Sequence, residues 1–155
     1  MPAALPARTP VVLDTSVIIK WFRQGEVLAD RALVLRDAYL EGRIAVIVPM
    51  LVAYELANVL RFKTDLTLEQ VRSAAQSLFD LSWDWAAPSS IGMGRAVEIA
   101  RAHGVTVYDA TFAALAESVH TDLITADECL VRQLSSLSFV HYLGDLSRVS
   151  GGFGR

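Results

Sequence analysis

Short apolar runs alternate along this chain with longer stretches in which apolar residues recur at helical spacing. Residues 10–14 and 44–48 are the clearest runs of the first kind, and both are rich in β-branched side chains. The stretch 27–40 carries apolar residues at positions 28, 32, 35 and 39, a spacing that puts them on one helical face. The pattern therefore predicts short strands that alternate with helices.

Proline, glycine and capping residues set the boundaries of the expected elements. Pro49 is well placed to open a helix over 50–62. Thr67 with Gln70 forms a capping-box pattern for a helix that reaches about residue 80. Gly104 is expected to end a helix. The remaining expected helices cover 90–103, 106–118 and 126–134, and the remaining expected strands cover 81–85, 122–125 and 139–142.

Strands of about four residues that alternate with helices predict parallel βαβ units with right-handed crossovers. The expected fold class is therefore α/β, as a three-layer α/β/α domain with a central, mostly parallel sheet of short strands. A length of 155 residues suits one domain. We expect a flexible lead over residues 1–9, a single domain over 10–146 and a flexible tail over 147–155.

Composition and charge exclude several classes of protein. With 53% hydrophobic and 20% charged residues, the chain is too apolar to be disordered, and a formal charge of −3 argues against a non-specific polyanion binder. Cys129 is the only cysteine, so no intramolecular disulfide is possible, which fits a reducing compartment. The longest apolar run, 44–54, is interrupted by a proline and is far shorter than the ~20 residues that cross a bilayer. The proline-bearing start has no continuous apolar segment typical of a signal peptide, so we expect a cytoplasmic protein.

Four acidic residues stand beside apolar residues at strand ends or on helices: Asp14, Glu55, Asp109 and Asp127. Functional groups of α/β sheets gather beyond the carboxyl ends of the strands, where Asp14 and Asp127 are expected. Like charges cannot be brought together in low dielectric without protonation or a counter-cation. If the fold brings the four acids together, the natural occupant is a divalent metal ion. The chain is then a candidate metal-dependent hydrolase of phosphate esters.

Each of these acids also has a structural interpretation. Glu55 could be an acid at the edge of the buried helix face or one paired with a nearby arginine. Asp14 is a favoured N-cap residue, and Asp109 follows Thr106 at the spacing of a capping motif. Asp127 would complement a helix dipole. These alternatives stay open at this point because sequence does not separate a cap from a ligand.

Two further expectations concern the neighbours of the acids. Thr125 and Glu128 form a second possible capping box, so Glu128 is expected to cap a helix. Glu55 is expected on an apolar helical stripe with Val52, Val59 and Phe62, where an unpaired charge would be costly.

Taken in order, these acidic motifs resemble the PIN-domain nucleases. The matching segments are Asp14-Thr15-Ser16 after the first strand, Glu55 on the helix after the second, Tyr108-Asp109-Ala110 opening a helix, and Thr125-Ala126-Asp127 after a late strand. Within that family, the compact size and the segment from Pro49 to Leu60 resemble the VapC-type toxins of toxin–antitoxin pairs. The resemblance runs from about residue 11 to about residue 143, nearly the whole chain.

The resemblance implies a Mg²⁺- or Mn²⁺-dependent endoribonuclease that acts as the toxin of such a pair. Asp14 and Asp109 are assigned as direct ligands, and Glu55 and Asp127 as further ligands or positioners of the attacking water. Hydrogen bonds that orient the carboxylates are assigned to two residues, Thr15 and Thr125. The resemblance also implies an RNA substrate, a homodimer and a cognate antitoxin, with the expected helices 27–40 and 50–62 as partner surfaces.

Other functions compete with this assignment. A free-standing PIN-type RNA-processing nuclease and a non-catalytic α/β binding module remain open. A haloacid-dehalogenase-type phosphotransferase would need a second Asp two positions after Asp14, where this chain has Ser16. A receiver domain would need a lysine after a late strand, and the only lysines are Lys20 and Lys63. Both of these rivals are therefore weakened.

Overall fold

The computed structural model describes residues 7–23 and 25–146. The expected tail over 147–155 and the first six residues of the expected lead lie outside the described residues. The strands are β1 (Thr9–Leu13), β2 (Ile44–Pro49), β3 (Asp84–Ala86), β4 (Asp122–Thr125) and β5 (Val140–Tyr142). Each expected strand is present, with its bounds shifted by no more than a few residues.

The five strands form one sheet in the order β3-β2-β1-β4-β5, and all neighbouring pairs are parallel. In the register of the central strand, Val12 lies opposite Ile47 of β2 and Leu123 of β4. The expectation of a mostly parallel sheet of short strands is confirmed. The buried parts of its three central strands are mainly apolar because helices cover both faces.

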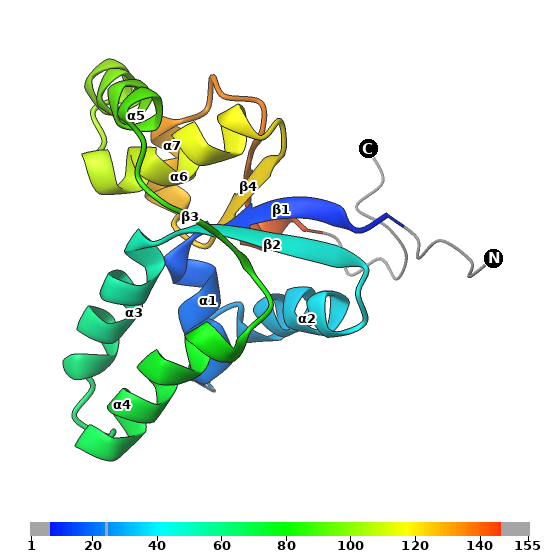
Figure 1. The fold of residues 1–155 in the computed structure, drawn as a ribbon, viewed down its shortest axis with the longest axis vertical. Coiled ribbons are helices and arrows are strands. Elements are labelled where there is room, and N and C mark those ends of the chain that lie inside the picture. The colour runs from blue at the N-terminus through cyan, green and yellow to red at the C-terminus, as the bar shows by residue number, and fades with distance from the viewer. Residues whose placement is uncertain (1–6, 24, 147–155) are drawn as a thin grey trace.

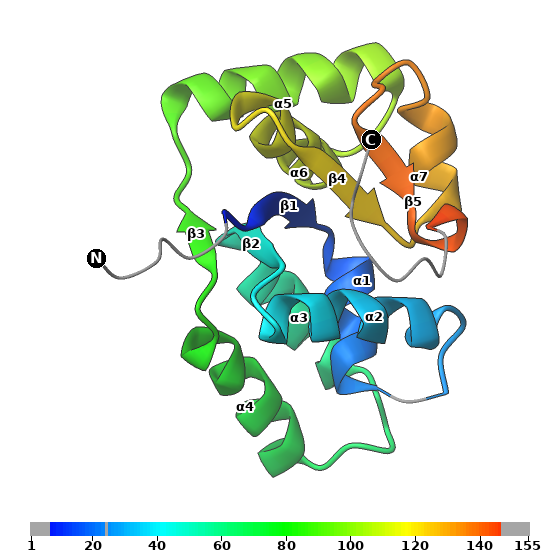
Figure 2. The same cartoon turned by 90° about the vertical axis from the view of Figure 1, so that its right-hand side faces the viewer.

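Helices cover the sheet as two layers. Figures 1 and 2 show α1 to α4 on one side of the sheet and α5 to α7 on the other, which confirms the three-layer arrangement. None of the helices within the described ranges is long and apolar enough to cross a membrane. The helices are α1 (Thr15–Phe22), α2 (Ala29–Leu40), α3 (Leu51–Arg61), α4 (Leu68–Ser77), α5 (Ser90–His103), α6 (Val107–Ser118) and α7 (Glu128–Gln133), with 3₁₀ turns η1 (Leu78–Asp80) and η2 (Leu143–Asp145).

Local chemistry explains several helix boundaries. The hydroxyl of Thr67 accepts a hydrogen bond from the N–H of Gln70, whose side chain in turn accepts from the N–H of Thr67, so the predicted capping box is present. Gly104 ends α5 in the left-handed region at φ +66°, which a residue without Cβ adopts at little cost. The helix expected to reach residue 80 changes to a 3₁₀ turn after Ser77.

The buried face of α3 differs from the expected one. Val52, Leu56 and Leu60 are buried, whereas Val59 is 38% and Phe62 is 64% exposed. The predicted stripe through Glu55, Val59 and Phe62 is therefore wrong. Two rows of residues on α3 have helical spacing, one through Glu55 and Val59 and one through Leu56 and Leu60. The fold buries the second row, which contains no charged residue. Glu55 lies at the edge of the buried face, half-buried.

Candidate active site

The site lies where the connections from neighbouring strands diverge. From β1 the chain moves to β2 on one side, and β4 lies on the other side of β1, so the strand order reverses between β1 and β4. Such a switch point leaves a crevice beyond the carboxyl ends of the strands. Asp14 directly follows β1, and its N–H donates to the carbonyl of Ile124 in β4 at 3.0 Å. The fold therefore positions Asp14 at this crevice.

Two hydroxyl groups hold the carboxylate of Asp14. Ser16 and Thr125 each donate a hydrogen bond to the same oxygen, Oδ2, and both distances are 2.7 Å. Asp14 occupies the N-cap position of α1, but its side chain makes no capping hydrogen bond. Burial raises the pKa of Asp14 above its ordinary value, the two hydroxyls lower it, and the charge of Asp109 raises it further. Asp14 is therefore not used as a helix cap.

Glu55 projects from the second turn of α3 toward the same region. Its Oε1 accepts a hydrogen bond from the hydroxyl of Thr15 at 3.0 Å. Burial raises the pKa of Glu55 to about 7; the hydrogen bond from Thr15 lowers it, and the charges of Asp14 and Asp109 raise it. A carboxyl group with this pKa is poised to exchange a proton at neutral pH.

Asp109 lies in the first turn of α6. Its backbone N–H donates to the hydroxyl of Thr106, the N-cap residue, at 3.0 Å. Among the described residues its carboxylate has no hydrogen-bond partner, and its charge acts on both Asp14 and Glu55. The fold thus brings three of the four predicted acids into electrostatic contact.

Asp127 is placed differently from the other three. Its side chain is the N-cap of α7 and accepts a hydrogen bond from the N–H of Leu130 at 3.0 Å. The expected capping box of Thr125 and Glu128 is wrong, because Glu128 instead pairs with Arg132 at 3.5 Å. Asp127 remains connected to the site through its own N–H, which donates to the hydroxyl of Thr125 at 3.1 Å. One of its carboxylate oxygens is engaged in capping, so its predicted role at a metal stays a prediction.

The donor set fits a divalent cation that is held mainly through water. Within residues 7–23 and 25–146, no three His, Cys, Asp or Glu side chains stand close enough together to enclose a metal ion directly. Burial and the charge of Asp109 nonetheless raise the pKa values of both Asp14 and Glu55, and a bound cation would relieve this cost of ionisation. Mg²⁺ takes oxygen ligands, keeps several waters and uses one or two carboxylates. The residues present match that mode of binding rather than a closed cage.

Sequence reasoning missed Ser16 as a member of the site. Its hydroxyl donates to Asp14 Oδ2, accepts from the N–H of Ala126 at 2.9 Å and lies 3.2 Å from the hydroxyl of Thr125. Ser16 belongs to the Asp14-Thr15-Ser16 segment that resembles the PIN-domain nucleases, and it argues against a haloacid-dehalogenase-type enzyme, but neither signal assigns it a role. The contact across 109 positions of sequence could not be seen without the sheet.

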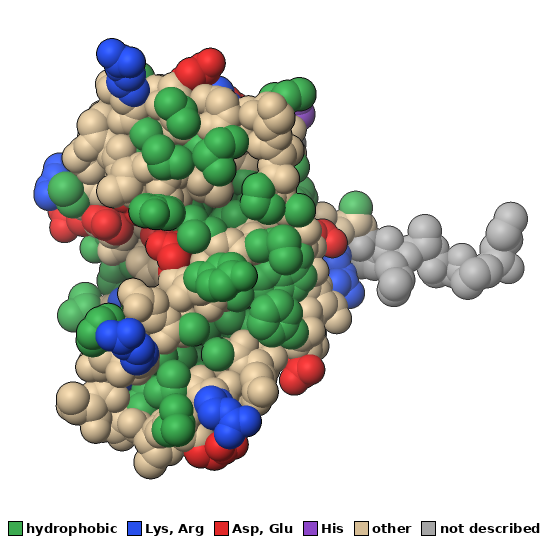
Figure 3. Space-filling model, turned by 60° about the vertical axis from the view of Figure 1, so that its left-hand side comes forward, with side chains coloured by type: hydrophobic (Ala, Val, Ile, Leu, Met, Phe, Trp, Pro, Cys, Tyr) green, Lys and Arg blue, Asp and Glu red, His purple; other side chains and the backbone are tan. Residues whose placement is uncertain are grey.

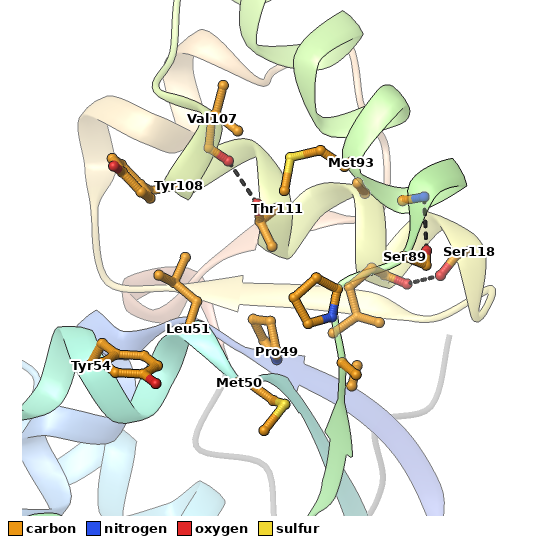
Figure 4. Close-up of a pocket in the computed structure, with 16 residues that line it drawn as sticks. Pro49, Met50, Leu51, Tyr54, Ser89, Met93, Val107, Tyr108, Thr111 and Ser118 are labelled. Atoms are coloured by element: carbon orange, nitrogen blue, oxygen red, sulfur yellow. Dashed lines mark hydrogen bonds between the residues drawn. The ribbon is translucent and has the colours of Figure 1, made fainter.

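An apolar groove of about 320 Å³ lies beside the acidic crevice, between the start of α3 and helices α5 and α6. Figure 4 shows Tyr54 and Tyr108 at one end of this groove and Met50 and Met93 among its walls. Each of the two tyrosines directly precedes an acid of the site, and they are 75% and 64% exposed. In Figure 3, hydrophobic side chains gather in the hollow between the two helical layers, with acidic side chains at one edge. In the first turns of α6, Tyr108 is exposed, whereas Ala110 and Phe112 are buried.

The fold and the site define an α/β protein with one parallel sheet and a group of interacting carboxyl groups at its switch point. The PIN domain family model matches residues 11–133, and the chain belongs to this family. No protein with a curated description matches the chain by sequence.

Solved structures with the same fold include proteins of toxin–antitoxin pairs. FitAcB from Neisseria gonorrhoeae is 19% identical with a TM-score of 0.66, and the alignment covers 88% of this chain and 99% of that one. VapC20 from Mycobacterium tuberculosis, described as a sarcin-ricin loop cleaving toxin, is 16% identical with a TM-score of 0.65 and coverages of 84% and 96%. A toxin–antitoxin complex from Klebsiella pneumoniae is 16% identical with a TM-score of 0.64 and coverages of 86% and 97%. At these identities the similarity establishes the fold.

Proposed function

We propose that this protein is a divalent-metal-dependent endoribonuclease and acts as the toxin of a toxin–antitoxin pair. The observation that carries the proposal is the electrostatic coupling of Asp14, Glu55 and Asp109 at the switch point of the sheet. Three carboxyl groups are held together there although burial and mutual repulsion disfavour their ionised forms, which is the arrangement that a cation site requires. Membership of the PIN domain family and the similarity to toxin structures support the same function.

The residues of the site have distinct proposed roles. Asp14 and Asp109 would hold Mg²⁺ or Mn²⁺, and Asp127 would position a water with the carboxylate oxygen that does not cap α7. Glu55 accepts a proton from the attacking water, since its pKa of about 7 matches the ambient pH. Thr15 and Thr125 orient the carboxylates of Glu55 and Asp14 through the hydrogen bonds of 3.0 and 2.7 Å. When bound, the metal supplies an activated water and neutralises charge on the scissile phosphate.

The acidic crevice repels the RNA backbone, so binding of RNA requires positively charged side chains elsewhere. A group of three cations is suited to this. Lys20, Arg23 and Lys63 surround Glu26 at 3.4, 3.3 and 4.0 Å. Arg23 also pairs with Asp65 at 3.2 Å, so three cations share two carboxylates and keep a net positive charge. We assign this group to contacts with the RNA backbone, which position a nucleic acid without reading its sequence.

Two partner surfaces follow from the exposed apolar residues. The groove beside the site, with Tyr54, Met93 and Tyr108, is proposed to pack against a second copy of the chain. The outer face of α3 and the turn after it, with Val59 and Phe62, is proposed to receive an antitoxin segment. Structures of toxin–antitoxin complexes among those of similar fold support a protein antitoxin.

The test is cleavage of structured RNA in the presence of Mg²⁺ or Mn²⁺, and again with excess chelator. Wild type is expected to produce discrete fragments that disappear with chelator. The Asp14→Asn/Asp109→Asn variant is expected to leave the RNA intact. A matched control is Asp37→Asn/Asp80→Asn, which changes two exposed acids outside the site and should cleave like wild type.

Two results would contradict the proposal in different ways. If wild type and the Asp14→Asn/Asp109→Asn variant yield the same fragments, the chain is not a nuclease and a binding module is favoured. If wild type cleaves RNA but its expression does not arrest growth, the chain is a free-standing RNA-processing nuclease.

A further inference from the structure

Ser16 is the residue that joins the two loops of the crevice. It lies near the start of α1, directly after β1, and its hydroxyl accepts a hydrogen bond from the N–H of Ala126, which directly follows β4. The same hydroxyl donates to Asp14 Oδ2 at 2.7 Å. A single side chain therefore connects the acid after one strand with the backbone after its neighbour.

The hydrogen bonds of Ser16 and Thr125 are equivalent in kind. Thr125 accepts from the N–H of Asp127 at 3.1 Å and donates to Asp14 Oδ2, just as Ser16 accepts from Ala126 and donates to the same oxygen. Each hydroxyl has one proton, and both protons are used on Oδ2. The distance of 3.2 Å between the two hydroxyl oxygens is then a packing contact. Both hydroxyls thus act on one oxygen of Asp14 and leave Oδ1 without a hydroxyl partner.

This arrangement explains why Asp14 does not cap the helix that it precedes. An aspartate in the N-cap position ordinarily accepts an N–H from the first turn of its helix. Asp14 makes no such capping bond, and its Oδ2 is instead engaged by donors from both sides of the switch point.

We propose that Ser16 is a positioning residue, which holds Asp14 with Oδ2 on the two hydroxyls and Oδ1 directed to the divalent cation. This inference rests on the proposed function. Without the Ser16 hydroxyl, the N–H of Ala126 loses its partner and Asp14 keeps only one side-chain donor, the hydroxyl of Thr125, so the crevice binds the cation less tightly. RNA binding is not affected, because Ser16 does not contact the cationic group around Glu26.

The experiment compares wild type with Ser16→Ala, Ser16→Thr and Ser16→Cys. Ser16→Thr keeps the hydroxyl, whereas Ser16→Cys keeps the volume with a poor donor. Ser73→Ala changes an exposed serine of α4 and is the matched control. Binding of Mn²⁺ is measured without RNA by water-proton relaxation, and hydrogen exchange of the Ala126 amide is measured by NMR. Cleavage rates are then measured over a range of Mn²⁺ and RNA concentrations.

Ser16→Ala and Ser16→Cys are expected to weaken Mn²⁺ binding by roughly tenfold, the effect of losing a hydrogen bond to a charged group. The Ala126 amide should exchange at least about tenfold faster in both. The cleavage rate should fall at low Mn²⁺ and recover at high Mn²⁺, with KM for RNA unchanged. Ser16→Thr and Ser73→Ala should stay within about threefold of wild type on every measurement.

The outcomes separate this inference from the proposed function. If the Ala126 amide exchanges faster while Mn²⁺ affinity is unchanged, Ser16 only joins the two loops, and the inference is wrong. It is also wrong if Ser16→Thr fails to restore Mn²⁺ binding, or if wild type binds no Mn²⁺. If wild type binds Mn²⁺ as expected but cleaves no RNA, the proposed function fails and the role of Ser16 toward the cation stands.

Discussion

The acidic crevice and the apolar groove are adjacent, and the same two helix turns contribute to both. On α3, Tyr54 lines the groove and Glu55 faces the crevice; on α6, Tyr108 and Asp109 are divided in the same way. Consecutive helical residues are about 100° apart, so one turn can serve two surfaces. The crevice is ordered by hydrogen bonds to buried or half-buried carboxylates, whereas the groove is nearly devoid of charge. The comparison teaches that two adjacent surfaces can be built on the same helix turns while differing in chemistry.

The largest expected effect comes from a single substitution that changes the crevice and leaves the groove intact. Glu55→Gln should lower the rate of RNA cleavage by about 10³-fold, since a positioned base contributes 10²–10⁴-fold, and should leave the oligomeric state unchanged. Single-turnover cleavage and light scattering measure the two quantities. A variant that cleaves within tenfold of wild type would remove Glu55 from the proposed mechanism.

The next effect concerns the buried face of α3, the helix that contributes to both the crevice and the groove. Leu56→Ala, at a fully buried position of α3, should lower the free energy of unfolding by about 2–5 kcal/mol. Val59→Ala on the outer face should cost less than about 1 kcal/mol. Urea denaturation of both variants measures the difference. Equal losses would mean that the buried row of α3 is not the one through Val52, Leu56 and Leu60.

A charge placed in the groove should act on assembly and spare the crevice. Met93→Glu should weaken the proposed homodimer by at least about 30-fold, or about 2 kcal/mol, because a carboxylate would have to be buried. Sedimentation against the monomer mass of 16.9 kDa measures the shift, and Leu68→Glu on α4, outside the proposed partner surfaces, is the exposed control. Should wild type sediment as a monomer at micromolar concentration, the groove would not be a dimer surface.

The smallest effect is a dependence of stability on pH. The pKa of Glu55 is about 7 in the folded protein against an ordinary 4.5, so between these values the unfolded chain releases a proton that the folded protein keeps. Stability should therefore fall as pH rises from about 4.5 to about 7 and level off above. Urea unfolding at pH 5, 6, 7 and 8 measures this dependence. The free energy of unfolding should fall less in Glu55→Gln than in wild type, and Asp14 is present in both proteins.

Adding Mg²⁺ provides the control for that measurement. The cation binds the ionised carboxylates of the folded protein, so it should reduce the fall in wild type and have less effect on Glu55→Gln. A wild-type stability that rises over pH 5 to 7 would contradict the raised pKa of Glu55.

Much of the fold could be predicted from the sequence because the relevant signals are local. The strand 122–125 and the helix 90–103 have the predicted bounds, and the Thr67–Gln70 capping box is present. The errors occur where two local solutions compete. Both rows of α3 satisfy the helical period, and both Asp127 and Thr125 are suitable caps for α7. Packing against the rest of the chain decides between such alternatives, and the sequence does not contain that information in any short segment.

The sequence by itself determined the order of elements, the α/β class and the four acids of the candidate site, because apolar periodicity, caps and strand ends are encoded within a few neighbouring residues. Only the tertiary structure decided how those acids are used. It joined Asp14 to Thr125 across 111 positions, gave Ser16 a contact with the backbone after β4, and assigned the side chain of Asp127 to a helix end. The reason is physical: burial, mutual charge and hydrogen-bond partners depend on which strands lie side by side, and the parallel order β2-β1-β4 brings together segments that are distant along the chain.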